Sequence, residues 1–138
     1  MDIKNLIQAA FNARKNSYSP YSGFKVGAAL LAESGVVFGG CNIENASYSC
    51  TNCAEKTAFF KAVSGGVKKF KAIAIVGGAG ETPDEICAPC GSCRQVMLEF
   101  CDYSDFDVIL ALNEEEYEIV KLKDLMPYPF LPENLETE

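Results

Sequence analysis

The order in which helical and strand-like segments follow one another constrains the fold of this chain more than any other feature. Apolar residues at helical spacing behind Asp2, a capping residue, predict a helix over 2–16. Apolar runs bounded by turn residues predict strands over 24–32, 36–43, 70–76, 106–112 and 117–122. Further helices are expected over 52–63, 90–101 and 123–126. This order predicts an α/β fold with helices packed on one five-stranded sheet, in a single domain over 1–138.

The composition argues against several classes of partner. The 138 residues contain no apolar run near the roughly 18 residues of a membrane span. The first residues are charged and lead into a helical pattern rather than an apolar signal segment, so we expect a cytoplasmic protein. A net charge of −7, without a basic stripe, repels phosphate backbones. We expect no membrane and no nucleic acid partner, and a small neutral or cationic ligand.

The chain is rich in cysteine and lacks histidine. Seven cysteines, an odd number, argue against a secreted disulfide framework and favour a metal or catalytic use. The absence of histidine excludes Ser-His and Cys-His nucleophile pairs and every imidazole ligand. Any general acid or base must therefore be a carboxylate, lysine, tyrosine or cysteine.

Three cysteines stand at the expected starts of two helices. Cys90 and Cys93 share a first turn, and Cys53 lies in the first turn of a helix that Thr51 or Asn52 is expected to cap. Helix N-termini favour thiolates, and zinc accepts such soft ligands in tetrahedral geometry. Three protein ligands leave a position open for water, which is typical of catalytic zinc.

The same spacing leaves a structural alternative open. Cys50 and Cys53 form one CxxC pair and Cys90 and Cys93 a second, and two such pairs can close a four-cysteine zinc site without chemistry. Against it, Cys50 would precede the helix cap. Glu55 also lies two residues beyond Cys53, where a carboxylate could move protons beside the metal.

The remaining features favour structural interpretations. A proline between Cys87 and Cys90 makes shared ligation by that third CxxC awkward, and Cys41 and Cys101 are expected to act as small apolar residues. The glycine-rich segment 77–80 is interpreted as a flexible loop, and the acidic run 114–116 as a solvated hairpin tip.

Two motifs resemble the zinc-binding signature of the cytidine deaminase family, in its all-cysteine, small-subunit form: Cys53-Ala54-Glu55, and the segment 89–95 with the sequence PCGSCRQ. The resemblance implies a zinc-dependent hydrolase that deaminates cytidine or deoxycytidine to the uracil nucleoside and ammonia, in pyrimidine salvage. Cys53, Cys90 and Cys93 would hold Zn²⁺, and Glu55 would carry the protons. The implied fold is a three-layer α/β/α arrangement with a five-stranded mixed sheet.

The resemblance extends to the substrate side and implies a role for each matching residue. Asn42 and Glu44 would bind the ribose, Phe24 would pack against the pyrimidine, and the Ala54 backbone would meet the base carbonyl. Small members of the family are usually homotetramers with shared active sites. The residues that would reach a neighbour's site are Ala46, Tyr48 and Phe130.

One position departs from the family pattern, because Lys56 stands where arginine is common. Lys56 and Arg94 are the candidates for compensating the charge of the thiolates. Two alternatives to a nucleoside deaminase remain at this point. One is a deaminase of another aminated heterocycle, such as blasticidin S, which the possible ribose contacts of Asn42 and Glu44 oppose. The other is the structural zinc module.

Overall fold

The computed structural model describes residues 1–135, so the last three residues of the predicted domain lie outside the described residues. Its centre is a five-stranded sheet in the order β2-β1-β3-β4-β5. The strands β3 and β4 are parallel and the other neighbours are antiparallel, so the sheet is mixed, as the resemblance implied. The strands are β1 (Lys25–Ala32), β2 (Val37–Cys41), β3 (Phe70–Gly78), β4 (Asp107–Ala111) and β5 (Tyr117–Lys121).

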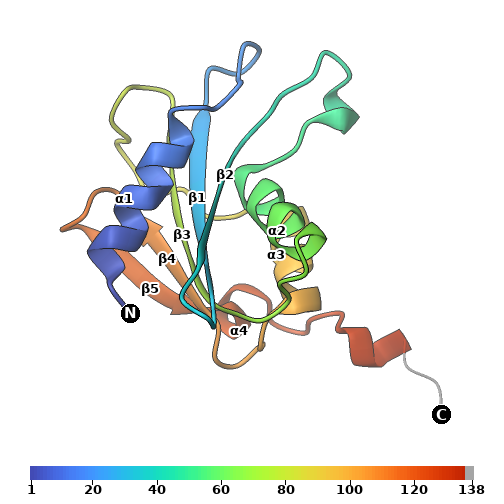
Figure 1. Ribbon diagram of the computed structural model, residues 1–138. Helices are drawn as coiled ribbons and strands as arrows, with labels where there is room; N and C mark the ends of the chain where they lie inside the picture. Colours follow the sequence, from blue (N-terminus) through green and yellow to red (C-terminus); the bar gives the residue numbers. More distant parts are fainter. Residues whose placement is uncertain (136–138) are drawn as a thin grey trace.

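Helices cover both faces of this sheet (Figure 1). Helix α1 (Ile3–Arg14) lies on one face, while α2 (Ala54–Ser64) and α3 (Gly91–Phe100) lie on the other, with the short α4 (Leu122–Leu125) following β5. The three-layer α/β/α prediction is confirmed. Two 3₁₀ turns, Tyr48–Cys50 and Pro132–Leu135, were not predicted.

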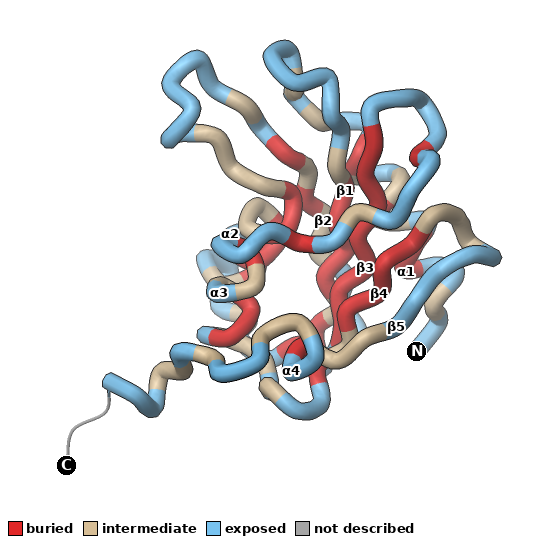
Figure 2. Tube along the Cα trace, turned by 180° about the vertical axis from the view of Figure 1, so that it is seen from behind, coloured by how far each residue is buried: buried red, intermediate tan, exposed pale blue. Residues whose placement is uncertain are grey.

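Alternation along the strands explains why the core has two halves. Successive side chains of a strand point to opposite faces. In β1, Ala29 packs with the apolar side of α1, whereas its neighbours Ala28 and Leu30 pack with α2 and α3. The central strands are buried because helices cover both of their faces, whereas β5 at the edge of the sheet is mostly exposed (Figure 2). Among residues 1–135, no helix is both long and apolar enough to cross a membrane.

The helix starts are the main correction to the sequence prediction. Asp2 caps α1 as expected, its carboxylate accepting a hydrogen bond from the backbone of Asn5 at 3.1 Å. Helix α2 begins later than predicted, because Cys53 itself is the cap rather than Thr51 or Asn52. Cys90 likewise caps α3. Two of the three candidate ligands thus stand immediately before their helices.

A glycine allows α2 to lie directly on the sheet. A Cβ atom at Gly40 in β2 would come within 2.5 Å of the Ala54 carbonyl oxygen and 2.6 Å of the Ala58 nitrogen. Both are backbone atoms of a helix, which cannot give way as a flexible side chain can. This contact fixes the first turn of α2, and with it the position of Cys53 and Glu55.

We expect Gly40→Ala to lower the free energy of unfolding by about 1 to 3 kcal/mol, since the added methyl group must push the helix off the sheet. The matched control is Gly65→Ala, whose Cβ would meet only ordinary contacts at 3.4 Å. Urea unfolding of both variants checks this, and equal midpoints would contradict it.

Candidate active site

Two helix N-termini bring the cysteines together. Cys53 precedes α2, Cys90 precedes α3, and Cys93 lies in the first turn of α3. The Cys53 sulfur accepts a hydrogen bond from the backbone nitrogen of Lys56 at 3.4 Å. Free backbone N–H groups and the helix dipole favour negative charge at both places. The fold therefore supplies a setting in which thiolates are stabilised.

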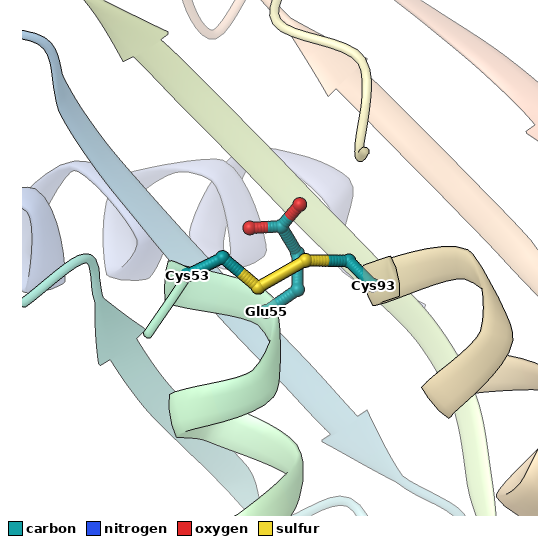
Figure 3. Close-up of side chains that lie close together, drawn as sticks. All are labelled: Cys53, Glu55 and Cys93. Atoms are coloured by element: carbon teal, nitrogen blue, oxygen red, sulfur yellow. A yellow bond between two sulfur atoms is a disulfide. The ribbon is translucent and has the colours of Figure 1, made fainter. Parts of the chain in front are cut away.

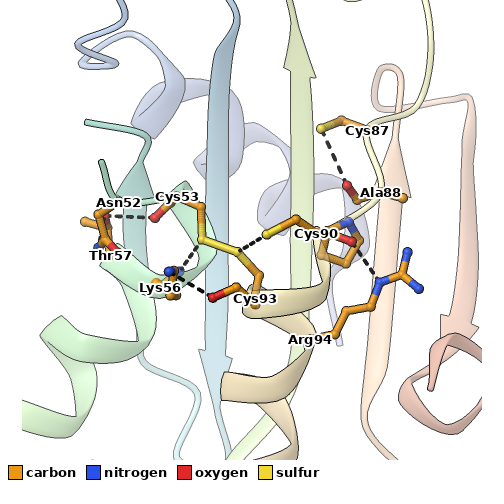
Figure 4. Close-up of a disulfide and its surroundings, with 11 residues drawn as sticks. Asn52, Cys53, Lys56, Thr57, Cys87, Ala88, Cys90, Cys93 and Arg94 are labelled. Carbon is orange, nitrogen blue, oxygen red and sulfur yellow. Dashed lines mark hydrogen bonds between the residues drawn. A yellow bond between two sulfur atoms is a disulfide. The ribbon is translucent and has the colours of Figure 1, made fainter. Parts of the chain in front are cut away.

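The sulfur atoms meet at one point between the helices (Figure 4). The Sγ atoms of Cys90 and Cys93 are 3.4 Å apart, close to the roughly 3.8 Å between two sulfurs of a tetrahedral zinc site. The sulfurs of Cys53 and Cys93 are joined as a disulfide, and the two Cα atoms are 7.2 Å apart. That separation exceeds the usual disulfide range of about 4.4 to 6.8 Å, and suits two thiolates bound to one ion. Three converging soft donors fit zinc once Cys53 and Cys93 are reduced.

Glu55 points at the same place from the first turn of α2 (Figure 3). A carboxylate oxygen of Glu55 and the sulfurs of Cys53 and Cys93 all lie within 4.8 Å of one another. Glu55 is only 4% exposed. Burial raises the pKa of this carboxyl, opposed by its own backbone amide and by the charge of Lys56. A carboxyl with a raised pKa beside a metal site is suited to taking up and returning a proton.

The other cysteines lie outside this group of metal-binding atoms. Cys50 is exposed in the 3₁₀ turn before α2. Cys87 is half-buried, and burial raises its pKa to about 11, with further contributions from the charges of Glu55 and Cys90. Burial also raises the pKa of the Cys41 and Cys101 thiols, as expected for cysteines that act as small apolar residues.

The side chains of Lys56 and Arg94, the two candidates for compensating the thiolate charge, point in different directions (Figure 4). The Lys56 ammonium donates a hydrogen bond to the Ser92 hydroxyl at 3.1 Å, and so bridges the starts of α2 and α3. The Arg94 guanidinium donates to the backbone carbonyls of Pro89 and Leu125, each at 2.8 Å. Lys56 is therefore the cation between the two helix starts, and Arg94 fastens α3 to the loop before it and to α4. Charge compensation by Arg94 stays a prediction.

Asn42, a predicted ribose contact, also joins two segments of the substrate side. Its amide donates to the Phe24 carbonyl at 2.7 Å, and its oxygen accepts from the backbone of Val26 at 2.9 Å and from the Ser17 hydroxyl. One amide hydrogen of Asn42 has no partner among these contacts, because the group has two donors.

Glu44 lines a pocket of about 370 Å³ and organises the loop beside it. Its carboxylate accepts hydrogen bonds from the backbone of Tyr21 and Ser22 at 3.0 and 3.1 Å and from the Ser22 hydroxyl. The Ser22 hydroxyl is the main reason that the pKa of Glu44 is lowered. The carboxylate is thus charged and held in place, with acceptor capacity remaining for a ligand.

The other predicted substrate contacts differ in burial, and their roles stay predictions. Phe24 is partly exposed at the start of β1, and Ala54 is fully buried in α2. Ala46 is exposed, as are Tyr48 and Phe130, at 77% and 56%. The Phe130 carbonyl accepts a hydrogen bond from Gln95 on α3 at 2.9 Å, which ties the C-terminal segment to that helix.

Comparison with known proteins agrees with this geometry. Residues 1–106 match the family model described as the cytidine and deoxycytidylate deaminase zinc-binding region. The chain belongs to the cytidine and deoxycytidylate deaminase family. It is 51% identical to a cytidine deaminase of Sporosarcina psychrophila, over 98% of this chain and 96% of that protein. It is 46% identical to one of Halalkalibacterium halodurans, over 98% of each chain.

A solved structure supports the deaminase fold independently. The crystal structure of cytidine deaminase from Burkholderia pseudomallei superposes with a TM-score of 0.83 at 46% identity, covering 91% of this chain and 97% of that one. The family model is a zinc-binding region, so the deaminase family and the sulfur geometry both point to zinc as the metal. The resemblance inferred from the two motifs is confirmed.

The sequence interpretation missed one residue of this deaminase that the structure makes prominent. Arg14, at the end of α1, is 6% exposed and donates hydrogen bonds only to backbone carbonyls among the described residues. Backbone carbonyls carry no sequence signature. The only available signal was a lone arginine at the end of an apolar helix pattern.

Replacing the candidate ligands one at a time distinguishes a three-cysteine site from a four-cysteine site. We expect Cys53→Ser, Cys90→Ser and Cys93→Ser to lose most of the bound zinc, because each removes a thiolate from the group. Cys50→Ser is the matched control and should retain it. Zinc content after purification under reducing conditions, measured by atomic absorption, checks this. Equal loss in Cys50→Ser would favour the structural four-cysteine site.

We expect Lys56→Gln to weaken zinc binding by about 10- to 100-fold, in line with the effect of removing groups that support metal ligands. The physical reason is that three thiolates around one Zn²⁺ carry net negative charge, which the ammonium offsets. Lys56→Arg should bind zinc nearly as well as the parent. Competition with a chromophoric chelator measures the affinity, with Lys61→Gln on the same helix as the control. An unchanged affinity in Lys56→Gln would leave Arg94 and the helix dipoles to compensate the charge of the thiolates.

Proposed function

We propose that this chain catalyses the zinc-dependent hydrolytic deamination of cytidine and/or deoxycytidine, giving uridine or deoxyuridine and ammonia. The observation that carries the proposal is the convergence of the Cys53 and Cys93 sulfurs with the buried Glu55 carboxylate, 4.8 Å or less apart, at the start of two helices. Cys90 adds a third sulfur to the group. The similar proteins named above are cytidine deaminases, which supports the same reaction and a nucleoside substrate.

Each residue of the group has a distinct task in this proposal. Cys53, Cys90 and Cys93 would hold zinc, which when bound would supply a Lewis acid for the hydrolysis. Glu55 takes a proton from the attacking water and delivers it to N3 of the pyrimidine. The water oxygen bonds to C4, and its remaining proton passes through Glu55 to the amino nitrogen, so that the C4–N bond breaks, the C4 carbonyl forms and one ammonia departs. Burial of Glu55 supports this role, because its raised pKa lets the carboxyl be protonated and deprotonated in turn.

The substrate side supplies orientation. Asn42 has an amide hydrogen left for a sugar hydroxyl, and Glu44 has acceptor capacity left for another. Phe24 offers an aromatic surface for the pyrimidine. The backbone N–H of Ala54, at the first position of α2, is among the helix donors without an intrahelical partner, and would bond to the base carbonyl.

The proposed assembly is a homotetramer in which neighbouring subunits complete each site. Tyr48 and Phe130 are 77% and 56% exposed in a single chain, so both side chains are accessible to a neighbouring subunit. Ala46, also exposed, lies beside Tyr48 in the same loop.

A site that needs reduced Cys53 and Cys93 suits the cytoplasm, where thiols are kept reduced.

The test of the function is Glu55→Gln, which keeps the shape of the side chain and removes its proton chemistry. We expect kcat for cytidine to fall by about 10²- to 10⁴-fold or more, the usual contribution of a general acid and base. Zinc content and unfolding midpoint should remain near those of the parent. Glu118→Gln, an exposed carboxylate on β5, is the matched control.

Ammonia release from cytidine, with and without a chelator, gives the readout. A zinc-loaded Glu55→Gln variant with near-parental turnover would remove Glu55 from the mechanism. A parent protein that binds zinc but releases no ammonia would contradict the proposed reaction itself.

A further inference from the structure

Arg14 is a buried cation whose partners are all backbone oxygens. At the end of α1, its guanidinium donates to the carbonyls of Lys25 at 2.9 Å, Gly78 at 2.8 Å, Gly80 at 2.5 Å and Glu81 at 2.8 Å. Among the described residues, none of the ion pairs involves Arg14. Burying a charge without a carboxylate is costly unless its donors are well satisfied. Here four carbonyl dipoles provide that satisfaction.

The four carbonyls belong to two segments that are far apart in sequence. Lys25 begins β1 and directly follows Phe24, the proposed pyrimidine contact. Gly78 ends β3, and Gly80 and Glu81 open the loop that leads to α3. The guanidinium therefore links the start of β1 to the loop that follows β3.

Phe24 and this loop together form the wall of one pocket. A pocket of about 210 Å³ is lined by Phe24 and by Gly77, Gly78, Ala79, Gly80, Asp84, Glu85 and Ile86. The Asn42 amide also holds the Phe24 carbonyl at 2.7 Å. The backbone at Phe24 is thus bound by the proposed ribose contact and, one residue later at Lys25, by Arg14.

The same loop continues to the metal-binding group. A Cβ at Gly77 would meet the Cys87 sulfur at 2.9 Å, so Cys87 packs tightly on the end of β3. Three residues later, Cys90 caps α3. A shift of the segment 78–81 would therefore displace both the loop that shares a pocket with Phe24 and the chain that leads to Cys90.

Docking of α1 does not rest on this arginine alone. The helix is also held by its own apolar face, in which Leu6, Ile7 and Ala10 are buried against β1, β3 and β4. We propose that Arg14 is a positioning residue for the Phe24 side of the proposed substrate site, holding Phe24 and the segment 78–81 in fixed relation to each other; this rests on the proposed function.

The experiment compares Arg14→Gln with Leu6→Ala, a control that weakens the docking of the same helix without touching the four carbonyls. A small displacement of positioning groups far from the chemistry is enough to alter substrate use strongly. We expect Arg14→Gln to raise KM for cytidine by about tenfold while kcat stays within about threefold, because ground-state binding is affected more than proton transfer. Leu6→Ala should change KM by less than about twofold at a comparable loss of stability. Arg14→Lys, which keeps the charge but not the fork of donors, should fall between the parent and Arg14→Gln.

Hydrogen–deuterium exchange on the zinc-loaded proteins provides a second readout that is independent of activity. Peptides covering 24–26 and 77–86 should exchange faster in Arg14→Gln than in the parent, and at parental rates in Leu6→Ala. If Arg14→Gln does not fold, Arg14→Lys carries both measurements. Equal KM values and equal exchange in the arginine and leucine variants would overturn the proposal. If the parent releases no ammonia, the proposed function fails, and the exchange rates alone decide whether Arg14 holds the two segments.

Discussion

The close contact between Gly40 of β2 and the first turn of α2 is the constraint on which the site depends. Only a residue without a Cβ allows the Ala54 carbonyl and the Ala58 nitrogen to approach the strand at this distance. Cys53 and Glu55 are immediate neighbours of Ala54, so their positions follow from that approach. The helix is held by the large apolar core around Phe59, and the strand contact sets how deeply it sits. The contact that seats α2 on the sheet therefore also sets the geometry of the site.

Charge is the second organising principle of the site. A chain with a net charge of −7 gathers up to three thiolates and a carboxylate in one small volume, without any histidine. Two helix N-termini and the ammonium of Lys56 oppose this negative charge. The lysine reaches from α2 to Ser92 on α3, so it also links the two helices that carry the ligands. In this chain a point charge occupies a position where a forked guanidinium would be able to contact two groups at once.

The sequence was informative where chemistry and local structure coincide. The strands and the helix order follow from apolar patterns, and Cys53, Glu55, Cys90 and Cys93 were identifiable because helix starts and cysteine spacing are local signals. The start of α2 was misplaced because cysteine is an unusual cap, so Thr51 and Asn52 seemed better candidates by residue type. The direction in which a side chain points was harder to predict than its place in a helix or strand. Arg94 adjoins the proposed ligand Cys93 in sequence, yet its direction is set by the carbonyls of Pro89 and Leu125. Arg14 binds carbonyls as many as 67 residues away, which no local pattern reveals.

The distribution of the ligands along the chain has a consequence for synthesis and folding. Cys53 and Glu55 follow the hairpin of β1 and β2, whereas Cys90 and Cys93 come only after β3 has crossed to the other side of β1. The first ligand and the last are 40 residues apart. A growing chain that ends at β3 contains one of the three proposed thiolate ligands, and the proposed set is complete only when α3 has formed beside α2. With this proposed set, metal uptake would be coupled to the late, long-range stage of folding, and a chain that retains its ion would also have completed the central part of its sheet.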